Sequence, residues 1–311
     1  MKSIHDLLGE ARLPSHSSLG GFLVSFSGAI FRREFLPEAS VRDFGLGSDQ
    51  NDVPLNQDYL GWLDLLDAVA MCDGTSFTVA ELGAGCGIWM LNAASLVRAR
   101  HPAKAIRLIG TEAEPSHFEF LLQAVRDNGF NPDDHRLVMA ALGSHTGLVW
   151  FYIGEASEWY GQSVVPSEHV QSMLSKNGLP TSYVPSKEGE ILETSLVYPN
   201  RRNVCRKAIS VRMMSLDDLI GDVDGVDFLH ADLQGAELDV IDASRDLLDA
   251  KVRIAHIGTH STEIEEGLRS TFGSLGWQKR WDFPRKSHSD TPFGTLTFGD
   301  GVQSWLNPRL S

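Results

Sequence analysis

The segment Thr78-Val-Ala-Glu-Leu-Gly-Ala-Gly-Cys-Gly-Ile-Trp-Met90 decides the fold class of this chain. It begins as a short apolar run, reaches the acidic residue Glu81, and continues with glycines at alternate positions, Gly83, Gly85 and Gly87. Glycine has no side chain and reaches backbone conformations with positive φ, so the pattern predicts a buried strand, a tight turn and the start of a helix. In such a turn the backbone can come close to a bound nucleotide.

The spacing of these glycines separates two classes of nucleotide ligand. A dinucleotide fingerprint has the form G-x-G-x-x-G, whereas this turn has the form G-x-G-x-G and places Ile88 where the third glycine would fall. The spacing therefore favours S-adenosylmethionine over NAD. A plain strand-to-helix turn without a ligand is the alternative.

The composition is that of a soluble globular protein. The chain has 311 residues, 42% of them hydrophobic and 22% charged, which suits one α/β domain with additions. Its formal net charge of −14 disfavours nucleic acid as a partner, because binding to phosphates requires dense basic residues. Cys72, Cys86 and Cys205 are odd in number and widely spaced, which favours free thiols. Since the apolar segment 20–31 is too short to cross a bilayer, we expect a cytoplasmic protein without a membrane partner, and homo-oligomer formation stays open.

We expect the chain to consist of two parts, an N-terminal cap and a catalytic domain. Prolines and glycines punctuate residues 1–55, so we interpret this part as an accessory cap without long helices. Helical periodicity begins at 56–71, directly before the glycine strand, and we assign residues 56–311 to one catalytic domain. Between about 154 and 206 the periodic pattern is lost, and we interpret this stretch as a lid or substrate insertion.

Strand-like and helix-like segments alternate beyond the glycine turn. This alternation predicts an α/β fold, with a mainly parallel sheet, helices on both faces and one antiparallel edge strand. Helical patterns occupy 89–100, 116–128, 236–246 and 263–273, and the main strand patterns occupy 105–115, 135–143, 148–153, 207–214, 226–234, 251–261, 277–283 and 295–298.

The strand after the glycine turn ends in Glu112-Ala-Glu-Pro115. A carboxylate at the carboxyl end of a strand in a doubly wound sheet can accept hydrogen bonds from both hydroxyls of a ribose. We assign this role to Glu112 and place Glu114 in the first turn of the next helix, although the reverse assignment is open. The small side chains of Ala140 and Ala141, at the end of the next strand, leave room for an adenine ring.

The second stretch with chemical character is Val226-Asp-Phe-Leu-His-Ala-Asp-Leu-Gln-Gly-Ala-Glu237. Side chains alternate faces along a strand, so His230, Asp232 and Gln234 are expected to point the same way, about 6.6 Å apart per step of two. The following strand pattern ends at His260, so Asp232 and His260 are expected at neighbouring strand ends.

Taken together, Glu81–Gly87, Glu112–Pro115 and Val226–Glu237 resemble class I S-adenosylmethionine-dependent methyltransferases, specifically the FkbM family. That family typically carries a strand followed by I-D-x-E-G-A-E. The residues that match this motif are Asp232, Gly235, Ala236 and Glu237, whereas His230 and Gln234 stand where lysine and glutamate are common.

The resemblance spans roughly residues 59–307 and implies a seven-stranded Rossmann-like fold. It also implies S-adenosylmethionine as cofactor and, as methyl acceptor, a hydroxyl on a sugar, polyketide or other small metabolite. By the family pattern, the glycine turn surrounds the methionine part and Glu112 the ribose. The expected cofactor contacts are Glu81, Gly83, Ala84, Gly85, Gly87, Glu112, Ala113, Ala140, Ala141 and Asp232.

Candidate bases follow from the need to take a proton from the acceptor. Carboxylate and imidazole do this near neutral pH, so we select Asp232 and His260, with His230 and His256 as second choices. His230 and His256 stand inside apolar strands, where a hydrogen-bonded core histidine is the preferred interpretation. Asp232 can alternatively hold the amino group of the cofactor.

The sequence leaves open a metal site and two other functions, and it also suggests residues that bind the methyl acceptor. Asp232, His256 and His260 could supply part of a divalent-metal site, but their spacing is not diagnostic and we assign no metal. A nicotinamide-dependent oxidoreductase and a catalytically silent cofactor-binding module are the alternative functions. Side chains suited to hydrogen bonding with the acceptor are Tyr160, Gln162, Ser163 and Gln234.

Overall fold

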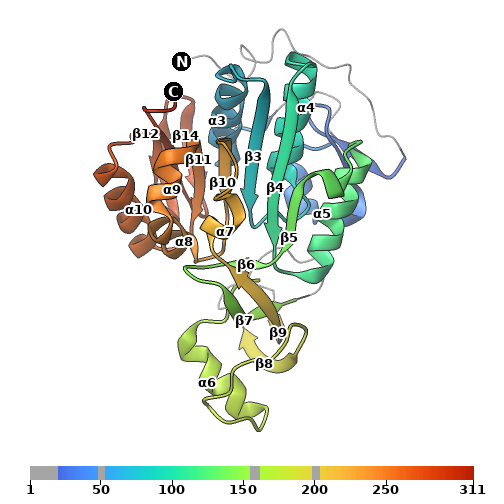
Figure 1. Ribbon diagram of the computed structural model, residues 1–311, viewed down its shortest axis with the longest axis vertical. Helices are drawn as coiled ribbons and strands as arrows, with labels where there is room; N and C mark the ends of the chain where they lie inside the picture. The colour runs from blue at the N-terminus through green and yellow to red at the C-terminus, as the bar shows by residue number, and fades with distance from the viewer. Residues whose placement is uncertain (1–19, 48–52, 155–161, 198–203) are drawn as a thin grey trace.

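Seven strands form the central sheet of the molecule (Figure 1). The computed structural model describes residues 20–47, 53–154, 162–197 and 204–311. The strand order is β12-β15-β11-β10-β3-β4-β5, and all strands except β15 run parallel to one another. The bounds are β3 (Ser76–Leu82), β4 (Ala105–Glu112), β5 (Arg136–Met139), β10 (Val226–Ala231), β11 (Val252–Thr259), β12 (Gln278–Phe283) and β15 (Gly301–Leu306).

The reversed strand β15 pairs antiparallel with both β11 and β12. The mainly parallel α/β fold expected from the sequence is therefore confirmed, but the reversed strand lies one place in from the edge of the sheet. Residues 295–298 belong instead to a separate hairpin of β13 (Ser287–Thr291) and β14 (Gly294–Phe298). Strand β15 escaped prediction because its central residues, Gln303 and Ser304, are polar, although both are completely buried.

Helices cover both faces of the sheet. Side chains of β3 alternate between two apolar layers: Phe77 and Val79 contribute to one layer, and Ala80 and Leu82 to the other. The first layer contains side chains of α3 (Asp58–Ala70), α4 (Ile88–Arg100) and α5 (Pro115–Asp127). The second contains those of α7 (Leu216–Ile220), α8 (Glu237–Ala243), α9 (Arg245–Lys251) and α10 (Thr262–Ser274).

The described part of the N-terminal segment packs against the helices of the first layer. Its elements are β1 (Phe22–Val24), β2 (Ile30–Arg32), η1 (Arg33–Phe35) and α2 (Glu38–Asp43). Phe26 lies edge-on to Trp62 of α3, with ring centroids 5.1 Å apart. The hydroxyls of Ser25 and Ser27 donate to Oδ1 of Asn92 in α4, at 2.6 and 2.7 Å. These contacts hold residues 38–44 near the amino ends of α3 and α4.

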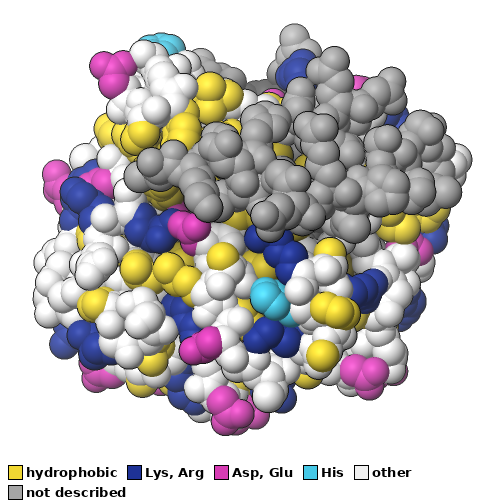
Figure 2. Space-filling model, turned by 90° about the horizontal axis from the view of Figure 1, so that it is seen from above, with side chains coloured by type: hydrophobic (Ala, Val, Ile, Leu, Met, Phe, Trp, Pro, Cys, Tyr) yellow, Lys and Arg dark blue, Asp and Glu magenta, His cyan; other side chains and the backbone are white. Residues whose placement is uncertain are grey.

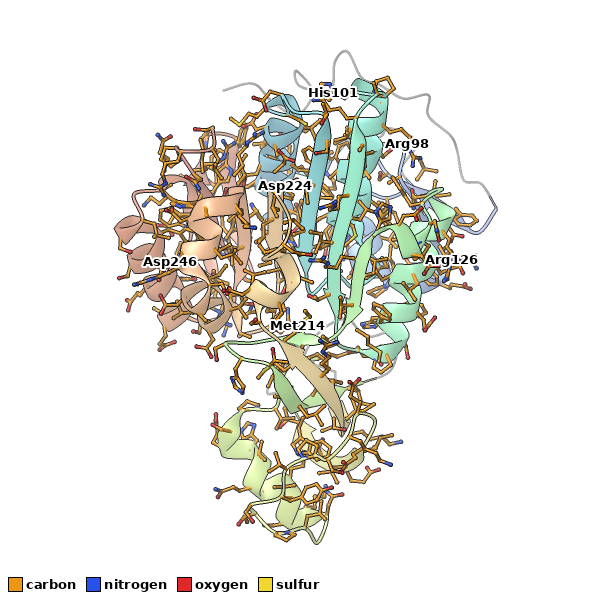
Figure 3. All side chains as sticks on the ribbon, viewed as in Figure 1. Arg98, His101, Arg126, Met214, Asp224 and Asp246 are labelled. Atoms are coloured by element: carbon orange, nitrogen blue, oxygen red, sulfur yellow. The ribbon has the colours of Figure 1, made fainter. Side chains whose placement is uncertain are left out.

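The described residues between 141 and 214 form an arm that projects beyond the carboxyl ends of the sheet strands (Figure 1). The expected strand 135–143 divides at Ala140, and the short 3-10 helix η2 (Pro132–Asp134) precedes its first half, β5. The second half of the expected strand, β6, joins a four-stranded sheet around β9. Strand β9 ends at Met214, where the arm meets the core (Figure 3). The arm consists of β6 (Ala141–Leu142), β7 (Gly147–Ile153), α6 (Ser167–Lys176), β8 (Ile191–Val197) and β9 (Val204–Met214).

Acidic and basic side chains are interspersed on the face shown in Figure 2, as far as its described residues reveal. Among the described helices, none is both long and apolar enough to span a membrane. Cys72 and Cys86 are free and buried, as expected, and the side chain of Cys205 lies outside the described part of the chain.

Candidate functional site

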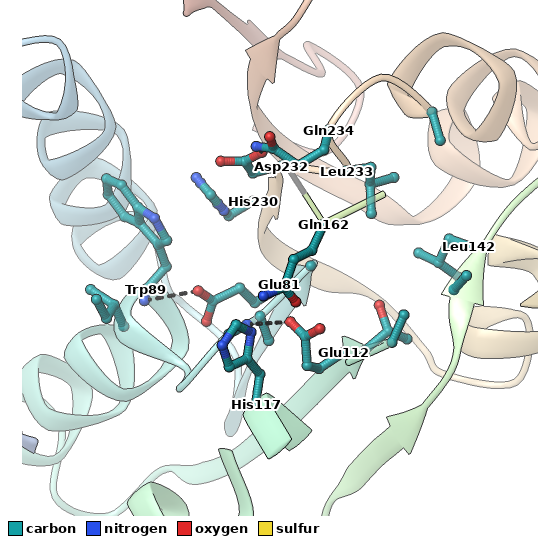
Figure 4. Close-up of a pocket in the computed structure, with 18 of the residues that line it drawn as sticks. Glu81, Trp89, Glu112, His117, Leu142, Gln162, His230, Asp232, Leu233 and Gln234 are labelled. Carbon is teal, nitrogen blue, oxygen red and sulfur yellow. Dashed lines mark hydrogen bonds between the residues drawn. The ribbon is translucent and has the colours of Figure 1, made fainter. Parts of the chain in front are cut away.

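The carboxyl ends of β3, β4 and β10 border a cavity of about 210 Å³. The N-terminal segment, the glycine turn and the base of the arm complete its walls. In Figure 4, Glu81 and Glu112 lie close together in the cavity, with His230, Asp232 and Gln234 across from them. Open α/β sheets bind their ligands in a crevice at the carboxyl ends of the parallel strands, which is where this cavity lies.

The glycine turn is shaped by close backbone packing. Gly83 has a φ of 76°, and a Cβ atom at this position would lie 2.0 Å from the backbone oxygen of Asp232. Gly83, Ala84 and Gly85 line the cavity. Gly87, which was also expected to contact the cofactor, does not line it. Gly87 instead caps the amino end of α4 with a φ of 80°, so its role lies in starting the helix.

The Glu81 carboxylate lies between the cavity and the first turn of α4. Its oxygens accept the backbone N–H groups of Trp89 (3.2 Å, Figure 4) and Met90 (2.9 Å), which the helix would otherwise leave unpaired. Burial raises the pKa of Glu81 to about 8, and repulsion from Glu112 and Asp232 adds to the effect of burial. A cationic group in the cavity would favour the ionised carboxylate.

Glu112 and Glu114 face different partners. Oε2 of Glu112 accepts the N–H of Gly85 and Oε1 accepts the N–H of Glu114, both at 2.8 Å, and Glu112 lines the cavity. Glu114 caps α5 by accepting the N–H of His117 at 2.7 Å and is not among the lining residues. This arrangement favours Glu112 over Glu114 for contact with a ligand.

The end of the cavity nearest the arm is apolar. Ala113, Ala140 and Ala141 line it together with Leu142 and Phe151, and all five side chains are buried. In Figure 4, Leu142 lies on the side of the cavity opposite Trp89. Small side chains beside two larger apolar ones leave a space suited to a flat aromatic ring.

Asp232, Gln234, Glu237 and His260 form one hydrogen-bonded group. Asp232 follows the last residue of β10, and Gln234 adopts a left-handed conformation with a φ of 53°, so the expected strand alternation ends before Gln234. The amide nitrogen of Gln234 lies 2.7 Å from Oδ1 of Asp232 and 2.9 Å from Nε2 of His260. Nδ1 of His260 lies 2.8 Å from Oε1 of Glu237, which is completely buried. Glu237 was not selected from the sequence, although its position in the family motif could have indicated it.

The two carboxylates around His260 control its protonation. Burial opposes a charge on the ring, but the hydrogen bond with Glu237 and the negative charges of Asp232 and Glu237 outweigh it and raise the pKa to about 9. Oδ1 of Asp232 is 3.4 Å from Nε2 of His260, and the Asp232 side chain is 44% exposed. A protonated ring cannot accept a further proton, so Asp232 is the member of this pair that can act as a base near neutral pH.

The two histidines proposed as second choices have different surroundings. His230 lines the cavity and stacks on Trp89, with centroids 4.5 Å apart and planes inclined by 20°. His256 is not among the residues that line the cavity, and its Nδ1 contacts Oδ2 of Asp64 at 2.8 Å, so it is the hydrogen-bonded core histidine that its apolar strand suggests rather than a second-choice base. Asp64 is fully buried and also accepts from Arg280 at 2.6 Å, so His256 belongs to an internal ion-pair network.

This placement also corrects the metal alternative. Asp232, His256 and His260 do not converge. The described residues bring Asp232, Glu237 and His260 together instead, with ligand atoms within 4.8 Å of one another. In this group Nδ1 of His260 lies 2.8 Å from Oε1 of Glu237, and Nε2 lies 3.4 Å from Oδ1 of Asp232.

The residues selected for acceptor binding have different locations. Gln162 and Gln234 line the cavity. Ser163 does not line it, and its backbone oxygen accepts the N–H of Tyr152 at 2.8 Å. Tyr160 lies outside the described residues.

Several lining residues escaped sequence reasoning, above all Asp43 and Asp58. Asp43 ends α2 and Asp58 begins α3, so neither belongs to a strand end or to the glycine turn. No local pattern marks them, because their proximity to the sheet depends on how the N-terminal segment packs. Trp89 and His117, in the helices after β3 and β4, were also missed, because only the strand ends and the glycine turn were searched for ligand contacts.

Comparison with known proteins finds a methyltransferase similar to this chain. A protein of Jannaschia sp. (strain CCS1) that is named as a methyltransferase is 25% identical over 213 residues, which are 68% of this chain and 65% of that protein. The chain thus spans somewhat less than two thirds of the length of this curated relative.

Solved structures give weaker likenesses. The methyltransferase FkbM of Methylobacillus flagellatus KT has 14% identity and a TM-score of 0.41, covering 74% of this chain and 44% of that one. The precorrin-6y C5,15-methyltransferase of Geobacter metallireducens GS-15 has 12% identity and a TM-score of 0.37, covering 81% and 90%. TM-scores this low do not support assigning a function to this chain. The model of the methyltransferase FkbM domain, however, matches residues 83–283, well over half of the chain. The chain therefore belongs to the FkbM methyltransferase family.

Proposed function

We propose that this methyltransferase transfers a methyl group from S-adenosylmethionine to a hydroxyl of a small metabolite. The observation that carries the proposal is that a glycine turn and the Glu112 carboxylate border the same cavity. Glycines allow close approach of a ligand to the backbone, and a strand-end carboxylate can bind the two hydroxyls of a ribose.

The chemical character of the cavity supports a consistent orientation for the cofactor. Its methionine part would lie along Gly83, Ala84 and Gly85, near Glu81. Its ribose would bind Glu112, and its adenine would occupy the apolar end formed by Ala113, Ala140 and Ala141. When bound, S-adenosylmethionine supplies an activated methyl group on a cationic sulfur.

Catalysis by this chain would consist mainly of holding and deprotonating the acceptor. Displacement at a methyl group requires the attacking oxygen in line with the bond that breaks, so positioning in the cavity provides much of the rate. Asp232 would accept the hydroxyl proton as the oxygen attacks. The protonated His260, held by Glu237, would keep Asp232 ionised until that step.

The acceptor is expected to be a small molecule rather than nucleic acid. The net charge of −14 and the carboxylates in the cavity would repel a phosphate backbone. The family match argues against a nicotinamide-dependent oxidoreductase, and a measurement of methyl transfer tests the alternative of a silent cofactor-binding module.

Calorimetric titration with S-adenosylhomocysteine and with NADH tests the cofactor. Binding of the homocysteine nucleoside is expected, and binding of NADH without it would refute the proposal. Once an acceptor is in hand, transfer of a labelled methyl group should fall about 100-fold or more in Asp232→Asn, because a general base contributes about that much. Unchanged transfer in this variant would remove Asp232 from the mechanism.

A further inference from the structure

We propose that the methyl acceptor carries an ammonium group, and that Asp43 and Asp58 bind it. We call these two residues the acidic wall. Both line the cavity, beside Asp232. This inference rests on the proposed function and extends it to the class of acceptor.

The acidic wall has no role in the proposed cofactor contacts. Those contacts use the glycine turn and the ends of β3, β4 and β10, whereas the wall comes from α2 and from the amino end of α3. The wall also lies outside the residues 83–283 that the family model matches. Because none of the proposed cofactor contacts uses the wall, we assign it to the acceptor.

The charges in the cavity favour a cationic ligand. Burial raises the pKa of Asp58 to about 7, and repulsion from Asp43, Asp232 and Asp300 adds to it. Among the described residues that line the cavity there is no Lys or Arg, and no ion pair of Asp58 is found in the described part of the chain. Arg42 contacts Asp43 at 3.8 Å, but its own side chain is 80% exposed. A cation between Asp43 and Asp58 would relieve the repulsion of carboxylates held in a partly dehydrated space.

A second observation points to a polar ligand in this cavity. His230 is 7% exposed and lines the cavity, and its Nδ1 has no hydrogen-bond partner among the described residues. Burial, followed by the proximity of His256, holds the pKa of His230 well below its usual range, so the ring is neutral. Because buried polar atoms in proteins are nearly always paired, a neutral imidazole left in this state suits a ligand that completes its hydrogen bonding.

An organic ammonium fits the acidic wall better than a metal ion does. Ligand atoms on one ion must lie close together, and within the described residues this condition is met by Asp232, Glu237 and His260, without Asp43 or Asp58. An ammonium group carries three N–H donors, so it can donate to several carboxylates without the tight cluster of ligand atoms that a metal ion needs.

A matched pair of small ligands tests the inference. The protein saturated with S-adenosylhomocysteine is titrated with 2-aminoethanol and with ethane-1,2-diol, which differ by an ammonium in place of a hydroxyl, at constant ionic strength. The amine should bind at least about tenfold more tightly, since hydrogen bonds to charged groups are worth that much. Equal binding, tighter binding of the diol, or no detectable binding of the amine overturns the inference.

Isosteric variants locate the effect. Asp43→Asn combined with Asp58→Asn should abolish the preference for the amine, and thermal unfolding shows whether the variant remains folded. The single Asp58→Asn variant should reduce the preference and serves if the double variant unfolds. Asp246→Asn is the control for net charge, because Asp246 is 97% exposed on the outer surface at α9 (Figure 3) and should leave the preference unchanged. A preference that survives in both wall variants overturns the inference.

The cofactor titrations separate this inference from the proposed function. If the wall variants weaken S-adenosylmethionine as much as 2-aminoethanol, the wall holds the cofactor's own charge, and the inference fails while the proposed function stands. If wild-type protein does not bind S-adenosylhomocysteine at all, the proposed function fails, and the comparison of amine and diol is then made on the free protein.

Discussion

Replacing Glu112 with glutamine tests the assignment of the ribose site. The variant keeps the size of the side chain but removes its charge and one acceptor oxygen, in a residue that is 8% exposed. Each Glu112 oxygen already accepts one backbone N–H at 2.8 Å, and the remaining lone pairs would serve the two ribose hydroxyls. Hydrogen bonds to a charged group are worth about 1.5–3 kcal/mol, so affinity for S-adenosylhomocysteine should fall about 10-fold to 150-fold.

Glu114→Gln is the matched control, because Glu114 lies two residues away and is also buried, at 5% exposure. It caps α5 through the N–H of His117, so its replacement should lower the free energy of unfolding by about 1 kcal/mol with little effect on affinity. Calorimetry measures the affinities and urea unfolding the stabilities. A larger loss of affinity in Glu114→Gln than in Glu112→Gln would refute the reasoning and transfer the ribose to Glu114.

The remaining predictions concern the glycine turn and two buried ionisable groups. Gly83→Ala should lower the free energy of unfolding by about 2 kcal/mol or more, because its Cβ would meet the backbone oxygen of Asp232 at 2.0 Å at a φ of 76°; an unchanged urea midpoint would contradict this. Gly85→Val should weaken S-adenosylhomocysteine by filling the cavity, and unchanged affinity would remove the turn from the site. Binding of S-adenosylmethionine at pH 7 should release protons, since a cation favours ionisation of Glu81, whose pKa is about 8; calorimetry in buffers of different ionisation enthalpy measures this, and proton uptake would contradict it. The His260 ion pairs should stabilise the fold by up to about 3 kcal/mol. This stabilisation should be fully present below pH 6.5 and should decrease as the pH rises through about 9, the pKa of His260 in the folded protein. A difference in unfolding free energy between wild type and His260→Gln that does not shrink at high pH would argue against a protonated ring.

The candidate base shows how structure narrows a choice that sequence leaves open. Four residues qualified by type, because each carries a carboxylate or an imidazole near a strand end. His256 is excluded by its contact with Asp64, a residue 192 positions earlier in the chain. His260 is disfavoured by Glu237 and Asp232, whose charges keep the ring protonated. Neither contact could be read from the spacing of residues along the strand.

Local patterns in the sequence by themselves indicated most strands of the sheet, the glycine turn and the acidic strand end that borders the cavity. An apolar strand, glycines at positions that need positive φ and an acid at a strand end depend on neighbouring residues, and parallel strands bring their carboxyl ends together in any sheet of this type. Tertiary structure alone decided the position of the reversed strand, the partners of each histidine and the acidic wall. Those features depend on contacts between segments far apart in the chain, such as the placement of Asp43, Asp58 and Asp232 around one cavity, and no local periodicity encodes such contacts.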